Sequence, residues 1–420
     1  MIGGNPLKQT RKAAVKRPNA FLYHIAVALL KPYLRLRYGM SYDCSIKKEI
    51  SEPFVLLANH SSAIDFMVAF CAMTPFRMNA VVTTYYFGNL VLAKLLKLMG
   101  CIPKTQFLPD MACVRAMSGV IARGGSVLIF PEGEVNGYGI NDIYPEGIAK
   151  LCRMLGAPVY VLKIRGSYLS SPKWAVSNRR GRMEASLERL FSPEDLKNIC
   201  DFEMNERIAS AIGHDEYAWQ QAAGLSFKGK NLAENIHGIL YLCPKCRSEF
   251  ALTGKENEVV CSSCGNTAVI DESGKFCPKN PGDKAYETVS EWIMAQRKAI
   301  ADELAEGKFH LEAPCFLLLH KDKKTLRHTI TGEGKILMTA LGLTYEGTLN
   351  EGIVKLFFSA DDLFKLPYGA LNHFEIPNTK ETIAIAPKEK RMIAKFVQAM
   401  PIVRAARDSK ADAVEREQSL

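Results

Sequence analysis

The chain of 420 residues lacks any uninterrupted apolar run of the roughly 20 residues that a membrane-spanning helix needs. It also lacks a stretch with the charged start, apolar middle and small-residue cleavage site of a secretory signal. Its 12 cysteines are scattered except for two CxxC pairs, which indicates reduced thiols plus one metal site in a cytosolic compartment. With 48% apolar and 23% charged residues, the composition excludes a disordered chain, and the length predicts several folded units.

Acidic residues are absent from the first 42 positions, which therefore carry most of the formal net charge of +10. The segment 21–40, FLYHIAVALLKPYLRLRYGM, mixes bulky apolar residues with flanking cations, a composition typical of helices in a membrane interface. Residues 1–42 are therefore predicted to be a basic, interfacial segment on an anionic membrane surface. A basic leader followed by an ordinary core helix is the alternative, and Pro32 is expected to kink or end the helix.

Short apolar runs alternate with helical patterns between residues 43 and 185. Four runs are predicted to be buried strands bounded by turn residues, at 54–59, 79–84, 126–133 and 157–164. The segments between them have helical apolar spacing, at 65–73, 88–100 and 145–156. This alternation predicts an α/β domain over 43–235, with a mixed or parallel sheet flanked by helices and a helical extension after residue 186.

The pattern changes again in the second half of the chain. The two CxxC pairs are followed by an amphipathic helical pattern, then by short β-rich runs, and then by one more helical pattern at 388–400. The β-rich runs indicate a small sandwich or barrel, for which a pleckstrin-homology-like fold is one candidate. The predicted units are a zinc ribbon at 236–275 and a connecting helix at 280–307. They are followed by a β-rich domain with a closing helix at 310–402 and a frayed polar tail at 403–420.

Residues 55–66, VLLANHSSAIDF, place a histidine at the end of an expected strand and an aspartate five positions later. Such an aspartate can bind the far ring nitrogen of the histidine, which fixes the tautomer and stabilises the imidazolium that forms when the ring takes a proton. No serine or cysteine nucleophile is needed if that proton comes from a substrate hydroxyl. His60 and Asp65 are therefore candidate catalytic residues, although this pattern by itself more often belongs to a structural histidine.

Two further blocks contain candidate site residues. In IFPEGE, a Pro-Glu-Gly turn places Glu132 at the end of an expected strand and the flexible Gly133 after it. In GCIPKT, Lys104 could hold a phosphate as a point charge. Ligands of α/β sheets bind outside the carboxyl ends of the strands, where His60 and Glu132 both fall. Taken singly, an ordinary turn explains the first block at least as well, and a solvated lysine explains the second block better.

In chain order, NHSSAID, GCIPK, FPEGE and APVYVL resemble the four blocks of the glycerolipid acyltransferase family, which includes bacterial 1-acylglycerol-3-phosphate acyltransferases. The resemblance covers residues 50–185. It implies that His60 deprotonates the glycerol hydroxyl of the acceptor, that Asp65 orients His60, and that the hydroxyl attacks an acyl thioester. It also implies that Asn59, Lys104, Glu132 and Gly133 bind the substrate. Pro158 and Val159 would contribute to the donor pocket.

The sequence departs from the family pattern in the second and third blocks. Glu134, Val135 and Asn136 follow Pro-Glu-Gly where threonine and arginine are frequent. Lysine stands at position 104 where arginine is frequent, which loses the bidentate geometry for phosphate. The sequence therefore defines the acceptor less well than the reaction. Candidate substitutes for the missing cation are Arg115, Arg153 and Arg165.

The two CxxC pairs, CPKC and CSSC, are separated by 14 residues. Cys243, Cys246, Cys261 and Cys264 have a spacing close to that of closed tetrahedral zinc sites, so a structural zinc ribbon is predicted, with redox-active CxxC motifs as the alternative and Cys277 as a spectator. Mixed charge and few aromatics in the ribbon argue against a nucleic-acid partner and leave a spacer role or an unknown protein partner. A weaker resemblance is to bacterial acyltransferases that carry such a ribbon after the catalytic domain.

Together these features predict an enzyme that transfers a fatty acyl group from acyl-CoA or acyl-ACP to a lysophospholipid acceptor. The first candidate acceptor is 1-acylglycerol 3-phosphate, and the product is then phosphatidic acid. The expected location is the cytoplasmic face of the cell membrane, as a peripheral protein. The alternative is a non-catalytic membrane or nucleic-acid adaptor on an acyltransferase-like scaffold. The sequence does not identify the backbone donors that would stabilise the oxyanion of the reaction.

Overall fold

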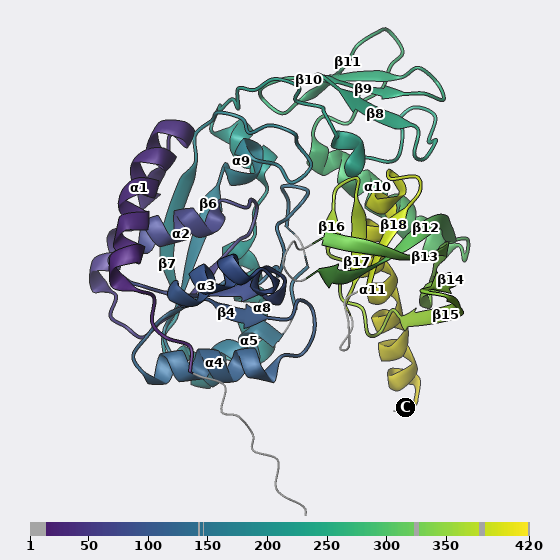
Figure 1. Cartoon of the computed structure of the whole chain (residues 1–420). Helices are drawn as coiled ribbons and strands as arrows, with labels where there is room; N and C mark the ends of the chain where they lie inside the picture. Colours follow the sequence, from purple (N-terminus) through teal and green to yellow (C-terminus); the bar gives the residue numbers. More distant parts are fainter. Residues whose placement is uncertain (1–13, 142, 146, 323–326, 378–382, 419–420) are drawn as a thin grey trace, which may run out of the picture.

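The computed structural model describes residues 14–141, 143–145, 147–322, 327–377 and 383–418. Figure 1 shows three parts in chain order: an α/β domain, a small cysteine-containing sheet, and a β-rich domain with two long helices. The first part contains the candidate catalytic and substrate-binding residues, and the second contains the four cysteines of the two CxxC pairs. The other two lie beside it, so that segments far apart in the sequence meet.

A seven-stranded mixed sheet forms the centre of the α/β domain, with strand order β1-β7-β6-β2-β5-β3-β4. Neighbouring strands run parallel except β6 and β7, which are antiparallel. The strands are β1 (Ser41–Asp43), β2 (Val55–Ala58), β3 (Asn79–Thr83), β4 (Ile102–Lys104), β5 (Val127–Ile129), β6 (Val159–Arg165) and β7 (Glu184–Phe191). The predicted α/β class, with helices flanking a mixed sheet, is confirmed.

Side chains that alternate along the central strand β2 build a core on each side of the sheet. Leu56 and Ala58 pack on one side with α1 and α2, whereas Val55 and Leu57 pack on the other with α4, α5 and α8. Because both faces are covered, all four residues of β2 are buried, and the strand is apolar without interruption. The helices of the two layers are α1 (Ala20–Tyr38), α2 (Asp65–Met73), α4 (Met111–Ala122), α5 (Gly147–Leu155) and α8 (Asp201–Ile212).

Shorter helices join these layers or follow the last strand. They are η1 (Ser45–Glu49), η2 (Thr84–Gly88), α3 (Leu90–Leu98), α6 (Ser167–Ser170), α7 (Asp195–Asn198), α9 (Glu216–Ala222) and η3 (Ile236–Gly238). The helical extension predicted after residue 186 is wrong at its start, because Glu184–Phe191 is strand β7. This segment pairs with β6 on one side and β1 on the other, and these sheet contacts override its polar local pattern.

Two prolines lie inside helices. Pro32 neither ends nor shortens α1, which continues to Tyr38, because Leu34 and Tyr38 beyond it are buried in the core of the domain. Pro401 lies inside α11 (Met392–Gln418), so the predicted polar tail continues the closing helix to residue 418. The ion pair between Arg407 and Asp361, 2.6 Å apart, ties this part of the helix to the β-rich domain.

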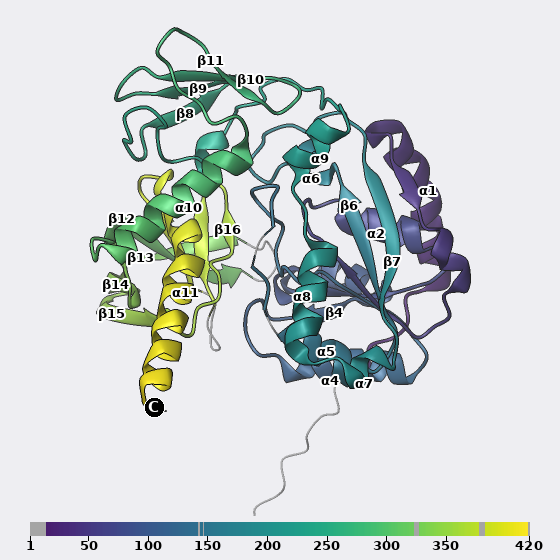
Figure 2. The same cartoon turned by 180° about the vertical axis from the view of Figure 1, so that it is seen from behind.

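The cysteine-containing sheet has strand order β11-β10-β9-β8, and α10 leads from it to a seven-stranded antiparallel sheet of order β15-β14-β13-β12-β18-β17-β16. Figure 2 shows α10 and α11 side by side on one face of this second sheet. The β-rich region is confirmed, and its pleckstrin-homology-like identity stays a prediction. The elements are β8 (Leu252–Lys255), β9 (Glu258–Cys261), β10 (Thr267–Ile270), β11 (Phe276–Pro278), α10 (Val289–Ala305), β12 (Leu311–Asp322), β13 (Arg327–Thr339), β14 (Gly342–Leu349), β15 (Gly352–Ser359), β16 (Tyr368–Gly369), β17 (His373–Ile376) and β18 (Ile383–Pro387).

Candidate active site

The candidate site lies where β2 and β5 end. These two strands are parallel neighbours, with Leu57 opposite Ile129, so the residues that follow them emerge at the same edge of the sheet. His60 follows β2, and Glu132 follows β5. Parallel pairing therefore brings together two blocks that are about 70 positions apart in the chain, as expected for ligand sites of α/β sheets.

His60 and Asp65 form a hydrogen-bonded pair. Nδ1 of His60 lies 3.1 Å from Oδ2 of Asp65, which also accepts a hydrogen bond of 2.7 Å from the backbone amide of Ser62. Asp65 is the first residue of α2 and is buried, whereas the His60 side chain is 20% exposed. The imidazole ring stacks on Phe130, with 4.3 Å between the ring centroids. Because Nδ1 faces Asp65, Nε2 is the nitrogen that can exchange a proton with another molecule.

Glu132 holds the backbone of His60. Its Oε1 accepts a hydrogen bond of 2.7 Å from the amide of His60, and its Oε2 accepts one of 3.1 Å from the side-chain amide of Asn136. The backbone amide of Asn136 in turn donates to the carbonyl of His60 at 2.7 Å. Glu132 is buried, so its carboxylate positions the histidine. Asn136 completes this ring of hydrogen bonds from a position that departs from the family pattern.

Asn59 is also buried and links β2 to β6. Its side chain donates to the carbonyl of Ile164 at 2.8 Å and accepts from the amide of Ile164 at 2.7 Å. It donates further to Oγ of Ser61 at 3.1 Å, and this oxygen lies 2.9 Å from Nε2 of His214. The side chain thus fixes the end of the strand from which His60 emerges.

Lys104 ends β4, and the loop that follows it contacts the turn that contains Gly133. The side-chain amide of Gln106 donates a hydrogen bond of 2.8 Å to the carbonyl of Gly133. Gly133 has a φ of +75°, and a Cβ at this position would lie 2.9 Å from the ring of Phe107. Nζ of Lys104 donates to the carbonyls of Thr105 and Leu108, at 2.5 and 2.7 Å. Its ammonium is thus bound by its own loop, and burial lowers its pKa.

The β-rich domain contacts the chain that follows Gly133 through a lysine. Glu134, next to Gly133, forms an ion pair of 3.0 Å with Lys173. Nζ of Lys173 lies 3.7 Å from the centroid of the Tyr368 ring, which comes from β16. Among the candidate substitute cations, Arg153 is bound elsewhere, because it joins α5 to Asp201 at 2.8 Å and to backbone carbonyls before α8.

Glu216 is a buried acid near the site that the sequence analysis missed. Its Oε2 accepts a hydrogen bond of 2.7 Å from the amide of Gly166, at the end of β6. Burial raises the pKa of Glu216 to about 8, and the negative charge of Asp65 adds to the increase. Glu216 is therefore mainly protonated near pH 7, which avoids a second buried negative charge beside Asp65. The histidine and acids of GHDEY (213–217) are the only local signal for it in the sequence.

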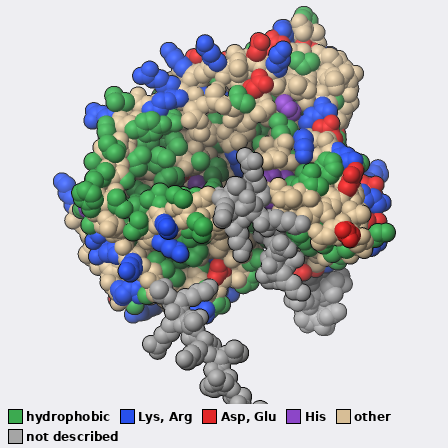
Figure 3. Space-filling model, viewed as in Figure 1, with side chains coloured by type: hydrophobic (Ala, Val, Ile, Leu, Met, Phe, Trp, Pro, Cys, Tyr) green, Lys and Arg blue, Asp and Glu red, His purple; other side chains and the backbone are tan. Residues whose placement is uncertain are grey.

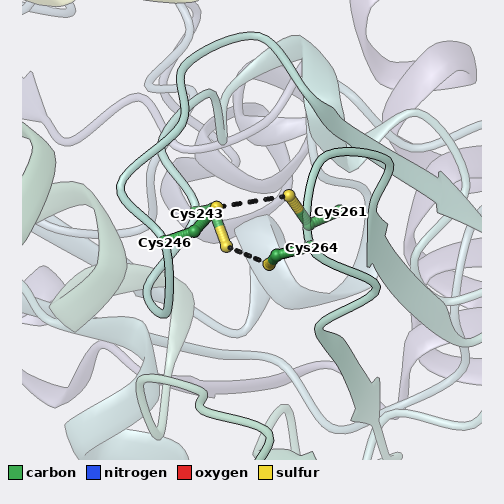
Figure 4. A group of neighbouring side chains, drawn as sticks. All are labelled: Cys243, Cys246, Cys261 and Cys264. Atoms are coloured by element: carbon green, nitrogen blue, oxygen red, sulfur yellow. Dashed lines mark hydrogen bonds between the residues drawn. The ribbon is translucent and has the colours of Figure 1, made fainter.

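The four cysteines come together as predicted and could hold a metal ion (Figure 4). Sγ of Cys243 lies 3.8 Å from Sγ of Cys264, and Sγ of Cys246 lies 3.8 Å from Sγ of Cys261. A tetrahedral zinc ion with bonds of about 2.3 Å separates its sulfur ligands by about 3.8 Å. The side chains present therefore fit the predicted structural zinc, and Cys277 lies outside the cluster.

Comparison with known proteins agrees with the motifs. The family model described as Acyltransferase matches residues 42–164, which include the site from Asn59 to Gly133. A similar solved structure is the 1-acyl-sn-glycerophosphate (LPA) acyltransferase PlsC from Thermotoga maritima, with 13% sequence identity and a TM-score of 0.41, covering 48% of this chain and 80% of that chain. No curated protein matches the chain.

We predict that Glu216 makes stability fall as the pH rises. In the unfolded chain this acid loses its proton near its ordinary pKa of 4.5, whereas in the folded chain it keeps the proton up to about 8. The folded state therefore loses stability between these values, by an amount on the order of a few kcal/mol, and no further above them. Thermal melting at pH 6 and pH 9 should show a larger decrease for the wild type than for Glu216→Gln. Equal decreases would contradict the assignment.

We also predict that the four-cysteine cluster binds one structural zinc ion. Cys261→Ser should lose this ion and melt at a lower temperature, because four-thiolate zinc contributes about 10–16 kcal/mol to the folding of small zinc modules. Zinc released by a thiol-blocking reagent, together with thermal melting, measures both effects. Cys277→Ser is the matched control, since Cys277 is exposed and outside the cluster, and it should keep the ion. A Cys261→Ser protein with unchanged zinc would exclude this site.

Proposed function

We propose that this chain, whose residues 42–164 form an acyltransferase-family domain, transfers a fatty acyl group from acyl-CoA or acyl-ACP to a lysophospholipid. The first candidate acceptor is 1-acylglycerol 3-phosphate. The observation that carries this proposal is the His60–Asp65 pair at the sheet edge, with a partly exposed imidazole ring and a buried carboxylate.

The proposed reaction uses His60 as a general base and then as a general acid. Nε2 takes the proton of the acceptor hydroxyl while the hydroxyl oxygen attacks the thioester carbon. Asp65 binds Nδ1, so it holds the required tautomer and stabilises the imidazolium. When the tetrahedral intermediate collapses, the carbon–sulfur bond breaks and the imidazolium returns the proton to the leaving thiolate. General base catalysis of this kind contributes a factor of about 10²–10⁴ to the rate.

Other residues of the site position this histidine and the acceptor. Glu132 and Asn136 fix the backbone of His60, and Phe130 holds one face of the ring. Lys104 remains the candidate cation for an acceptor phosphate, because its loop contacts Gly133 through Gln106. To bind a phosphate, the ammonium would have to exchange its hydrogen bonds to the carbonyls of Thr105 and Leu108.

The acceptor lipid requires access to a bilayer, and the flank formed by α1 and α3 has suitable chemistry. Figure 3 shows hydrophobic side chains gathered over this flank. No helix among the described residues has the length and apolarity that a transmembrane segment requires. We propose that this flank lies on an anionic membrane surface, at the cytoplasmic face. Its exposed apolar residues are Phe21, Ile25, Leu29, Tyr33 and Leu36 of α1 and Leu90, Val91, Leu95 and Leu98 of α3.

The alternative is an adaptor without catalytic activity, which the departures Glu134 and Asn136 would favour. The contacts of Glu134 and Asn136 argue against this non-catalytic alternative. Asn136 supports the backbone of His60, and Glu134 is neutralised by Lys173, so neither disrupts the His60–Asp65 pair.

We predict that His60→Ala lowers the turnover of lysophosphatidic acid and an acyl thioester by about 10²–10⁴-fold, because the base is lost. Asp65→Asn should also lower turnover strongly, since its amide no longer favours the imidazolium. Product formation measured by mass spectrometry tests both. His310→Ala changes an exposed histidine between α10 and β12 and should leave turnover unchanged. Unchanged turnover in His60→Ala would eliminate the proposed enzyme.

We further predict that Leu29→Glu combined with Leu36→Glu weakens binding to anionic vesicles. The two leucine side chains are 69% and 77% exposed on α1, and the substitution places acids where apolar contact with the bilayer is expected. Flotation with phosphatidylglycerol-containing vesicles measures the effect. Ile353→Glu introduces the same change at a 91% exposed position of β15 and should float like the wild type. If the double variant floats equally well, the membrane assignment of α1 is wrong.

A further inference from the structure

A second cluster of metal-ligating side chains lies in the β-rich domain, away from the four cysteines. It consists of His328 on β13 and of His373 and Glu375 on β17, and one ligand atom from each lies within 4.8 Å of the others. His373 and Glu375 are two positions apart on one strand, so their side chains share a face. In the sheet, β12 and β18 separate β13 from β17. Curvature of the sheet must therefore bring His328 to the other two residues.

The distances within this cluster suit ligands of one ion better than direct hydrogen bonds. Oε1 of Glu375 lies 3.5 Å from Nε2 of His373 and 3.8 Å from Nε2 of His328, and the two imidazole rings have centroids 4.5 Å apart. A direct hydrogen bond would bring nitrogen and oxygen to about 2.7–3.2 Å. A tetrahedral zinc ion with bonds of about 2.0–2.2 Å holds neighbouring nitrogen and oxygen ligands about 3.3–3.6 Å apart. The observed distances are therefore those of ligands around an ion, to within a few tenths of an ångström.

The burial of the three side chains and their convergence on one point also favour a bound ion. The three side chains are only 11%, 13% and 18% exposed, in the order His328, His373 and Glu375. Both imidazoles converge on one carboxylate oxygen, at distances longer than those of a direct hydrogen bond. A divalent cation could bind all three groups at once, because imidazole nitrogens and a carboxylate oxygen are ligands of such ions.

We propose that His328, His373 and Glu375 bind a divalent transition-metal ion, with zinc as the best fit, in a site distinct from the four-cysteine cluster. Two imidazoles and one carboxylate suit zinc and its neighbours in the first transition row, whereas magnesium and calcium prefer oxygen ligands throughout. Three protein ligands leave one position of a tetrahedral ion open to water or another small ligand. The ion would join β13 to β17.

The site also lies next to the α/β domain. Tyr85 belongs to η2, which follows β3, and burial together with the charge of Glu375 raises the pKa of Tyr85. Glu375 is therefore close enough to act electrostatically across the boundary between the two domains. An ion at Glu375 would reverse the sign of the local charge that faces η2.

The experiment counts metal ions on the full chain. Protein freed of metal by chelation and dialysed against zinc should bind two ions per chain, one at each site. His373→Ala and Glu375→Gln should each bind one ion and keep the ion that a thiol-blocking reagent releases. His310→Ala and Glu312→Gln are the matched controls, because they alter an exposed histidine and an exposed glutamate at the start of β12, outside the cluster, and both should bind two.

Cobalt substitution separates the two sites by their spectra and guards against misfolded variants. Cobalt at the cysteine cluster gives intense sulfur-to-metal charge-transfer absorption, whereas cobalt at the histidine cluster contributes only weak visible bands. Glu375→Gln should remove the weak bands and leave the intense ones, which also shows that the ribbon is folded. The proposal is overturned if the wild type binds a single ion, or if Glu375→Gln and His373→Ala still bind two.

Discussion

The hydrogen bond between Nδ1 of His60 and Oδ2 of Asp65 is the contact on which the proposed chemistry depends. It forms because a strand end and the first turn of the next helix place the two side chains within reach. Glu132 and Asn136 then hold the backbone of His60 from the neighbouring strand end. The imidazole is thus fixed by its partner at one ring nitrogen, by its own main chain and by the ring of Phe130. Such preorganisation allows a partly exposed base to act without first being ordered by substrate.

The acidic side chains around the His60–Asp65 pair are protonated, hydrogen-bonded or paired with a cation. Asp65 accepts hydrogen bonds from His60 and Ser62, whereas Glu216 nearby keeps its proton because burial raises its pKa. At the rim, Glu134 is paired with Lys173. If Glu216 and Glu134 were both unpaired anions, the site would repel a phosphate-bearing acceptor. The arrangement therefore leaves Asp65 and Glu132 as the carboxylates that hold the histidine, whereas Glu216 keeps its proton and Glu134 is paired.

The sequence predicted those features that depend on local pattern. Buried strands, the helix that begins at Asp65 and the cysteine cluster all follow from spacing within one segment, and the His60–Asp65 pair spans a single strand end and turn. What could not be predicted depends on partners elsewhere in the chain. Asn59 and Glu132 were expected to contact substrate, but both are buried against backbone groups of other strands or turns. Strand β7 exists because β1 and β6 flank it, and α11 passes Pro401 and is tied to the β-rich domain by the ion pair of Arg407 with Asp361.

The departures from the acyltransferase pattern and the added β-rich domain are linked through one chain of contacts. Glu134 stands immediately after the Pro-Glu-Gly turn, and an unpaired acid there would disfavour phosphate. Lys173 neutralises it at 3.0 Å, and the ring of Tyr368 from the β-rich domain covers the ammonium at 3.7 Å. Gly137 leaves the space that this tyrosine fills, because a Cβ there would lie within 1.9 Å of its hydroxyl oxygen. An acid in this block is therefore tolerated because a residue more than 200 positions later in the chain completes its surroundings. The C-terminal domain is thus in contact with the block that follows the Pro-Glu-Gly turn rather than an independent attachment.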